Sequence, residues 1–177
     1  EDKHPTIAHK WIHALTLPRE LKMVDGKLLQ VPLEELALLR KDRLVEKSDL
    51  KLSDDGVGLD NSKSKAFELS LSFEKDVTSF ELELSETVQL TFDASESVFS
   101  LHRKSFVTGE WESRSCRLQV LTELRAYVDS SSIEVFLNGG EEVFTARIFP
   151  AGYASRMVTV SGVGTVEEMQ VWKIEPE

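Results

Sequence analysis

Apolar and polar residues alternate with a period of two along most of this chain. The clearest run is Phe67-x-Leu69-x-Leu71-x-Phe73, and similar runs follow it. This period places successive side chains on opposite faces of a strand, so that one face packs and the other meets water. The pattern predicts about ten short antiparallel strands after residue 43. Their spans are 67–73, 80–84, 88–92, 98–101, 118–120, 124–128, 133–137, 143–147, 157–160 and 169–173.

Strands of this kind predict an all-β fold, an antiparallel β-sandwich whose core comes from one face of each of two sheets. A closed barrel has the same alternation, and the pattern alone does not separate the two. The aromatic residues of the strands alternate with polar residues and share faces with Leu and Val. We therefore expect them in the core rather than on a sugar-stacking surface: Phe67, Phe73, Phe80, Phe92, Phe99, Phe136 and Phe144.

The first part of the chain has a different pattern. Residues 1–10 are polar and predict a loop, and residues 11–17 predict a strand. Asp25-Gly26 separates two short apolar runs, and both residues tolerate the positive φ of a two-residue turn, so residues 20–31 predict a hairpin.

The period then changes, because Leu33, Leu36 and Leu39 recur at helical spacing after Pro32. Proline suits the first helical turn, and the acidic residues that follow it suit the positive end of the helix dipole. Residues 32–42 therefore predict one short helix of about ten residues. The sandwich is expected to follow over residues 43–177.

Composition excludes several functions. The chain has 31 acidic and 21 basic residues and a net charge of -10, and its densest basic groups are Arg40-Lys41-x-Arg43 and His102-Arg103-Lys104. Binding to a nucleic-acid backbone needs a larger basic cluster, so no nucleic-acid partner is expected. The apolar runs are too short to span a membrane. The single Cys116 excludes an internal disulfide and favours a reducing compartment, so we expect a cytoplasmic location.

No catalytic or metal-binding group emerges from the residue pattern. His4, His9 and His13 lack a carboxylate or thiolate to complete a zinc site, and a strand would separate residues 9 and 13. Adjacent acidic residues on a strand point to opposite faces, so the pairs predict solvated rims: Glu34-Glu35, Asp54-Asp55, Glu141-Glu142 and Glu167-Glu168. Ser132 has no nearby histidine to activate it, and Trp111 lies in a polar stretch that predicts partial exposure. We expect no catalytic residue, substrate ligand, metal or cofactor.

Two segments carry a resemblance to a known family. The first is WIHALTLPREL at residues 11–21, followed by Asp-Gly-Lys-Leu at 25–28 and the expected helix at 32–40. The second is YVDSSSIEVFLNGG at residues 127–140, followed by TARIFP at 145–150. Both resemble bacterial members of glycoside hydrolase family 32, the sucrose-6-phosphate hydrolases, invertases and related β-fructofuranosidases.

The resemblance implies the fold of an enzyme with a five-bladed β-propeller followed by a β-sandwich. It implies that residues 1–31 are a remnant of the last propeller blade, that residues 32–42 are a linker helix, and that residues 43–177 are the C-terminal sandwich. Because the chain begins at Glu1 rather than Met, we expect it to be a piece of a longer protein. Its partner would be the N-terminal propeller of the same protein, and a homodimer is also possible.

The family uses three acidic residues of the propeller in a retaining mechanism on sucrose or sucrose 6-phosphate. They lie in Asn-Asp-Pro, Arg-Asp-Pro and Glu-Cys motifs. This chain contains neither Asp-Pro nor Glu-Cys, so no catalytic role transfers to its residues. The resemblance implies a structural role, with Asp129, Ser132, Glu134 and Asn138 forming turns and interfaces, and with Arg19 pairing with neighbouring strands. A carbohydrate-binding module is the alternative, with Trp111 as its stacking residue.

Overall fold

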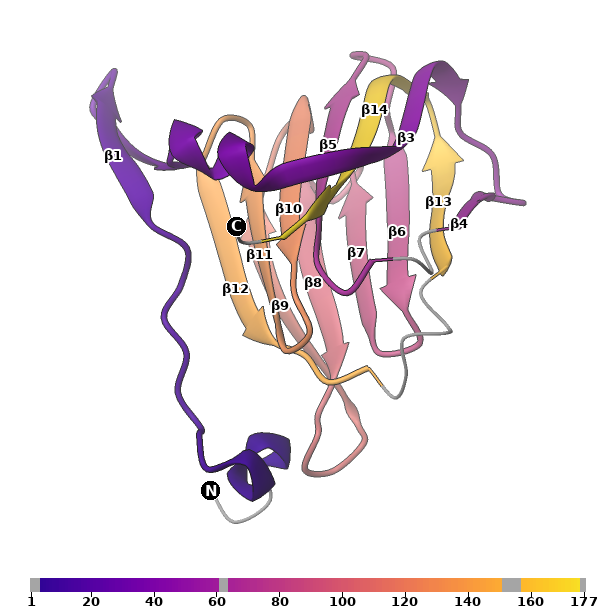
Figure 1. Cartoon of the computed structure of the whole chain (residues 1–177). Coiled ribbons are helices and arrows are strands. Elements are labelled where there is room, and N and C mark those ends of the chain that lie inside the picture. Colours follow the sequence, from indigo (N-terminus) through magenta and orange to yellow (C-terminus); the bar gives the residue numbers. More distant parts are fainter. Residues whose placement is uncertain (1–3, 61–63, 151–156, 176–177) are drawn as a thin grey trace.

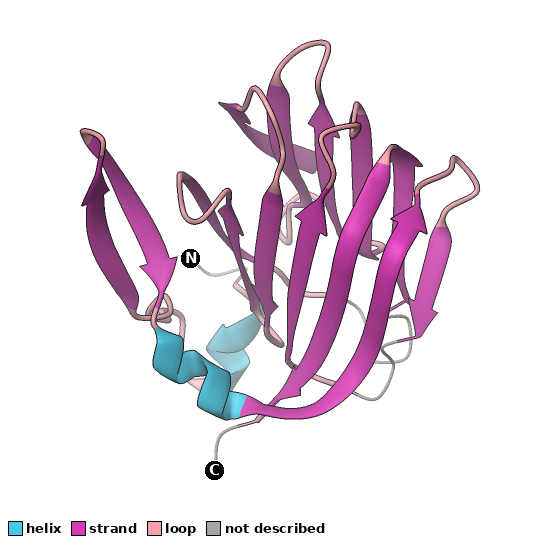
Figure 2. Ribbon diagram, turned by 90° about the horizontal axis from the view of Figure 1, so that it is seen from above, coloured by secondary structure: helices cyan, strands magenta, loops and turns pink. Residues whose placement is uncertain are grey.

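The computed structural model describes residues 4–60, 64–150 and 157–175. Two six-stranded sheets face each other, and a two-stranded hairpin stands beside them (Figures 1 and 2). Every strand pair is antiparallel, and both large sheets are open, which confirms the sandwich and excludes the barrel. No helix in the described ranges is long and apolar enough to cross a membrane.

The first sheet has the order β12-β11-β10-β5-β14-β3, and the second has the order β4-β13-β6-β7-β8-β9. The strands of the first sheet are β3 (Arg40–Lys51), β5 (Phe67–Phe73), β10 (Glu123–Val128), β11 (Ser132–Leu137), β12 (Glu142–Arg147) and β14 (Thr165–Ile174). Those of the second are β4 (Val57–Asp60), β6 (Ser79–Ser85), β7 (Val88–Asp93), β8 (Val98–Lys104), β9 (Trp111–Arg117) and β13 (Met157–Val163).

The core lies between the two sheets, where the alternating residues meet. Phe67, Leu69 and Leu71 of β5 and Leu82 of β6 are fully buried there, and Phe99 of β8 joins them. Burial of one such side chain contributes roughly 1.5–3 kcal/mol. The alternation therefore predicted both the strands and the face of each strand that packs.

Two expectations for the strands were wrong. Residues 118–120 form no strand, and β9 (Trp111–Arg117) precedes them as the edge strand of the second sheet. Its residues are mostly polar and exposed, because an edge strand packs against one neighbour only, so it has no alternating apolar signal. The long edge strand β3, and β4, were missed for the same reason.

The hairpin is present as β1 (Arg19–Val24) and β2 (Lys27–Pro32). Asp25 and Gly26 have φ values of 49° and 80°, so both turn residues adopt the expected positive φ. The expected strand at 11–17 is wrong, since those residues form no strand, and a short 3-10 helix, η1 (Pro5–His9), lies within the predicted loop. Residues 1–3 of that loop lie outside the described residues.

The predicted helix is shorter than expected and is a 3-10 helix, η2 (Glu34–Leu39). It cannot extend to ten residues, because Pro32 ends β2 and β3 begins immediately after the helix. Leu36 of η2 packs on Tyr127 and Phe136, outside the sandwich core. Phe136 was expected in that core, but it faces the opposite side of β11, where η2 covers the sheet.

Candidate functional site at the junction of the hairpin and the sandwich

A partly buried ion pair joins the hairpin to the first sheet. Arg19 Nη2 of β1 lies 2.6 Å from Glu134 Oε2 of β11, and the two side chains are 17% and 6% exposed. The same nitrogen donates to Thr145 Oγ1 at 2.7 Å, and Leu17 N donates to Glu134 Oε1 at 2.6 Å. Arg19 Nη1 donates to Gln30 Oε1 at 2.9 Å, so one guanidinium links both hairpin strands to β11 and β12.

The turn between β11 and β12 makes the second contact with the hairpin. The main-chain amide of Gln30, in β2, donates to the main-chain carbonyl of Gly140 at 3.0 Å. A Cβ at Gly140 would lie 2.1 Å from the main-chain carbonyl oxygen of Gln30, so the hairpin fits only against glycine at this position. Asn138 holds the turn, because its Oδ1 accepts from the Thr122 amide at 2.9 Å. The predicted turn at 138–140 is therefore confirmed, and Arg19 pairs with a neighbouring strand as expected, through Glu134 of β11.

One face of the hairpin is apolar and open. The strand register places Leu21 opposite Gln30 and Met23 opposite Leu28. Leu21, Met23 and Leu28 are 63%, 70% and 52% exposed, and Leu15 before the hairpin is 99% exposed. A two-stranded hairpin is at best marginally stable in water, and an open apolar face marks a surface that another element covers.

A buried carboxylate ties the η2 end of the first sheet together. Glu68 of β5 has no exposed surface and accepts two hydrogen bonds of 2.7 Å from Arg40 of β3. Arg125 Nε lies 3.1 Å from it, and the Tyr127 hydroxyl donates to it at 3.1 Å. Burial, and then the negative charge of Glu68, raise the pKa of Tyr127 far above its usual range. This cluster is structural, because Arg40 also stacks on Trp172, 4.0 Å from the ring centroid.

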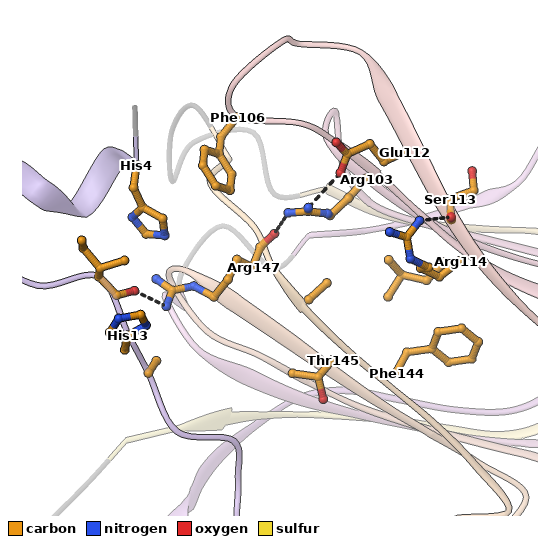
Figure 3. Close-up of a pocket in the computed structure, with 14 residues that line it drawn as sticks. His4, His13, Arg103, Phe106, Glu112, Ser113, Arg114, Phe144, Thr145 and Arg147 are labelled. Atoms are coloured by element: carbon orange, nitrogen blue, oxygen red, sulfur yellow. Dashed lines mark hydrogen bonds and ion pairs between the residues drawn. The ribbon is translucent and has the colours of Figure 1, made fainter. Parts of the chain in front are cut away.

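A separate cleft of about 550 Å³ lies between the N-terminal segment and the sandwich (Figure 3). His4 and His13 line one side, and Arg147, from the end of β12, points toward them. Arg103 of β8 donates to the Arg147 carbonyl and to Glu112 Oε2 of β9, both at 2.8 Å. The charged residues that line the cleft are three arginines, Arg103, Arg114 and Arg147, and one carboxylate, Glu112.

The histidines considered as metal ligands do not form a site. His4 and His13 line the cleft, whereas His9 is exposed on η1 and does not line it. Within the described ranges no group of three or more His, Cys, Asp or Glu residues could hold a metal ion. His4 instead caps η1, with its Nδ1 2.8 Å from Thr6 Oγ1.

The remaining candidate residues have structural surroundings. Ser132 begins β11, where its carbonyl accepts from the Asp129 amide at 2.9 Å. Glu141 pairs with Lys27, the first residue of β2. Trp111 is half-exposed on β9, as expected, but Lys104 Nζ lies 5.4 Å from its ring centroid. The expected turn at Asp129 and Ser132 is confirmed, whereas Glu141, expected on a solvated rim, is partly buried in an ion pair.

Sequence reasoning missed the arginines of the cleft. Arg103, Arg114 and Arg147 lie on three different strands and make no basic cluster in the sequence. Arg103 stood in the short basic group at 102–104 and Arg147 in the TARIFP stretch at 145–150, but neither was linked to a site, and Arg114 drew no notice. The pairing of β8 with β9, and the packing of residues 4–14 beside them, brought the three together.

The fold and the hairpin junction define an antiparallel β-sandwich with a two-stranded hairpin attached to its first sheet. Residues 35–173 match the family model described as "Glycosyl hydrolases family 32 C terminal", and the chain belongs to this family. It is 34% identical over 175 residues to the sucrose-6-phosphate hydrolase of Bacillus subtilis, covering 98% of this chain and 36% of that protein.

Solved structures agree with the fold. A sucrose-6-phosphate hydrolase from Lactobacillus gasseri superimposes with a TM-score of 0.79 at 20% identity, over 97% of this chain and 36% of that one. An exo-inulinase from Aspergillus awamori superimposes with a TM-score of 0.70 at 25% identity, over 90% of this chain and 35% of that one. The chain thus spans about a third of the length of the relatives it matches.

Proposed function

We propose that this chain is the C-terminal sandwich of a retaining β-fructofuranosidase that hydrolyses sucrose or sucrose 6-phosphate in the cytoplasm. Its role is structural: the sandwich supports the catalytic propeller and holds the last strands of that propeller in place. The division proposed is 1–31 for the propeller strands, 32–42 for the linker and 43–177 for the sandwich. The names of the relatives and the family membership support this proposal.

The observation that carries the proposal is the hairpin β1–β2. It is held to the sandwich at its base by Arg19 and Gln30, yet its face bearing Leu21 and Met23 is open. A strand pair with this arrangement is suited to complete a sheet formed by another part of the same protein, whose main-chain groups and apolar side chains would cover it. The propeller is the occupant we propose.

The proposal includes a lack of activity in the chain alone. Retaining glycoside hydrolysis requires two carboxyl groups about 5–5.5 Å apart on either side of the scissile bond. The Asp-Pro and Glu-Cys motifs that hold the family's acids are absent from the sequence. We expect the purified 177-residue chain to release no glucose or fructose from sucrose or sucrose 6-phosphate, and measurable turnover would overturn the structural role.

A chimera tests the role directly. In the Bacillus subtilis enzyme, the 36% that matches this chain would be replaced by the chain itself. We expect sucrose 6-phosphate hydrolysis by the chimera, and loss of most activity in the double variant Leu21→Glu/Met23→Glu. The control is Lys22→Glu, on the opposite face of the same strand. Equal losses in the two variants would show that the apolar face is not the docking surface.

The carbohydrate-binding alternative is tested by the same preparation. Saturable binding of sucrose or a fructan by the isolated chain, abolished by Trp111→Ala, would favour a sugar-binding module over a support. We expect no such binding, because Lys104 already lies over the Trp111 ring. A homodimer formed through the open hairpin would appear as a doubled mass in light scattering, and Leu21→Glu/Met23→Glu would return it to a monomer.

A further inference from the structure

The cleft between residues 4–14 and the strands β8, β9 and β12 is lined by more positive than negative side chains, although the protein as a whole is acidic. The whole chain carries a net charge of -10. The cleft nevertheless gathers three guanidinium groups, Arg103, Arg114 and Arg147, with Glu112 as the one carboxylate among its lining residues. Clefts lined by one sign of charge concentrate ligands of the opposite sign. A local positive field in an acidic protein therefore indicates an anionic ligand.

Arg147 supplies a donor that its protein neighbours leave unused. Its Nε donates to the Ser131 carbonyl at 2.9 Å and its Nη1 to the Ile12 carbonyl at 3.2 Å. Its Nη2 is buried and has no hydrogen-bond partner among the described residues. A buried donor left without an acceptor costs free energy, more so on a charged group. An anion at this point would remove that cost.

Aromatic rings hold this guanidinium in place before any ligand arrives. The Arg147 guanidinium carbon lies 5.0 Å from the Trp11 ring centroid and 5.3 Å from that of Phe149. A guanidinium fixed in this way loses little conformational entropy on binding, and its planar fork matches the oxygens of a phosphate or carboxylate.

The charge of Arg147 acts on the neighbouring His4 at this end of the cleft. Partial burial, and then the charges of Arg147 and His13, lower the pKa of His4. Figure 3 shows the Arg147 guanidinium directed toward His4 and His13, with Arg114 at the far end of the cleft. Arg114 donates from Nη1 to the Ser113 carbonyl at 2.8 Å, the one side-chain hydrogen bond it makes to the described part of the chain.

The size and walls of the cleft indicate what accompanies the anionic group. Its volume of about 550 Å³ falls within the range of small-molecule sites and exceeds what a lone phosphate fills. Leu101, Phe106 and Phe144 supply apolar walls. Such walls suit the apolar face of a sugar ring, while the arginines suit a phosphate group.

We propose that this cleft binds a phosphate monoester of hexose size, with the phosphate at Arg147 Nη2 and the sugar lying toward Phe106 and Arg114. The site consists of residues of this chain alone. It therefore stands apart from the catalytic role proposed above for the parent enzyme, and it needs no hydrolysis of the ligand.

Titration of the 177-residue chain at low ionic strength tests the proposal. Glucose 6-phosphate, inorganic phosphate and glucose would be compared by calorimetry and by the fluorescence of Trp11, which lies against Arg147. We expect saturable binding of glucose 6-phosphate, binding of inorganic phosphate about tenfold weaker, and no binding of glucose. Equal affinity for the two phosphates would overturn the assignment of the sugar, and no saturable binding of either would overturn the site.

Variants assign the binding to the cleft. Arg147→Gln should weaken binding of glucose 6-phosphate by about tenfold or more, as expected for loss of a charge-assisted hydrogen bond. Replacing Arg147 also removes its hydrogen bonds to Ile12 and Ser131. Arg114→Gln is therefore a second variant, because the Arg114 side chain makes only one local hydrogen bond among the described residues. It should weaken binding several-fold. Arg117→Gln, on the same strand but outside the cleft, is the control of equal charge.

The control separates a site from general charge attraction. Unchanged binding in Arg117→Gln with weakened binding in Arg114→Gln and Arg147→Gln supports the proposal. Equal weakening in Arg114→Gln and Arg117→Gln overturns it, because the loss would then follow net charge rather than position. Full binding in both Arg147→Gln and Arg114→Gln also overturns it.

Discussion

Replacing Gly140 by alanine should loosen the hairpin from the sandwich, whereas replacing Gly139 should not. Both residues have positive φ, 89° at Gly140 and 68° at Gly139. An L side chain in this region costs about 1–2 kcal/mol at either position, so the backbone cost cancels in the comparison. The difference lies in space, because an added Cβ at Gly139 meets nothing within 4 Å, while at Gly140 it meets the Gln30 carbonyl oxygen at 2.1 Å.

The magnitude follows from that overlap. An ordinary carbon-to-oxygen contact is about 3.3 Å, so β2 must withdraw by roughly 1 Å. This movement breaks the hydrogen bond from the Gln30 amide to the Gly140 carbonyl, worth about 1 kcal/mol. It also strains the Arg19–Glu134 ion pair, which contributes about 1 kcal/mol after allowance for the solvent that still reaches Arg19. The sum of about 2 kcal/mol corresponds to roughly thirtyfold more frequent opening of the junction.

Amide hydrogen exchange measured by NMR gives the test, because it reports local opening. The Gln30 amide should exchange roughly thirtyfold faster in Gly140→Ala than in Gly139→Ala. The amide of Leu69, in the fully buried part of β5, should be protected equally in both. Equal exchange of Gln30 in the two variants would refute the argument that Gly140 sets the distance between hairpin and sandwich.

Three further predictions concern buried and titratable groups. Glu68→Gln should lower the free energy of unfolding by about 2–3 kcal/mol, a value reduced for the partial exposure of its arginine partners. The exposed Glu46→Gln should cost less than about 1 kcal/mol, and equal urea midpoints would contradict this. The pKa of His4 is lower in the folded chain than its ordinary value of 6.5. As the pH falls through about 6.5, the imidazole therefore takes up a proton in the unfolded chain before it does so in the folded chain. Docking of η1 should therefore weaken with falling pH, and an unchanged protection of the Thr6 amide would contradict it. Burial raises the pKa of the Cys116 thiol to about 11, so alkylation by iodoacetamide at pH 8 should be on the order of 100-fold slower than for a free thiol, a rate measurable by mass spectrometry.

The alternation of residues was enough to predict most of the core strands, because burial imposes it directly, whereas the open sheets of the structure decided between sandwich and barrel. β5, β6, β7, β10 and β11 each pack an apolar row against the opposite sheet, and each was predicted within about one residue of its ends. The edge strand β9 escaped prediction because it contacts a neighbour on one side only, which leaves its sequence free to be polar.

Phe136 shows why the face of a residue is harder to predict than its strand. Its position in β11 is part of a regular alternation, yet both faces of that strand are buried. Val135 faces the sandwich core, whereas Phe136 packs under η2 with Tyr127 and Leu36. A strand covered on both sides has no polar row to mark its outward face.

By itself, the sequence determined most of the core strands, the Asp25-Gly26 hairpin and the absence of the Asp-Pro and Glu-Cys motifs, since each depends on neighbouring residues or on short repeats. Only the tertiary structure decided the rest. Arg19 meets Glu134, and Arg147 meets Ile12, across separations of more than 100 residues. No local pattern encodes such contacts, because the chain path that brings them together is set by the packing of whole sheets.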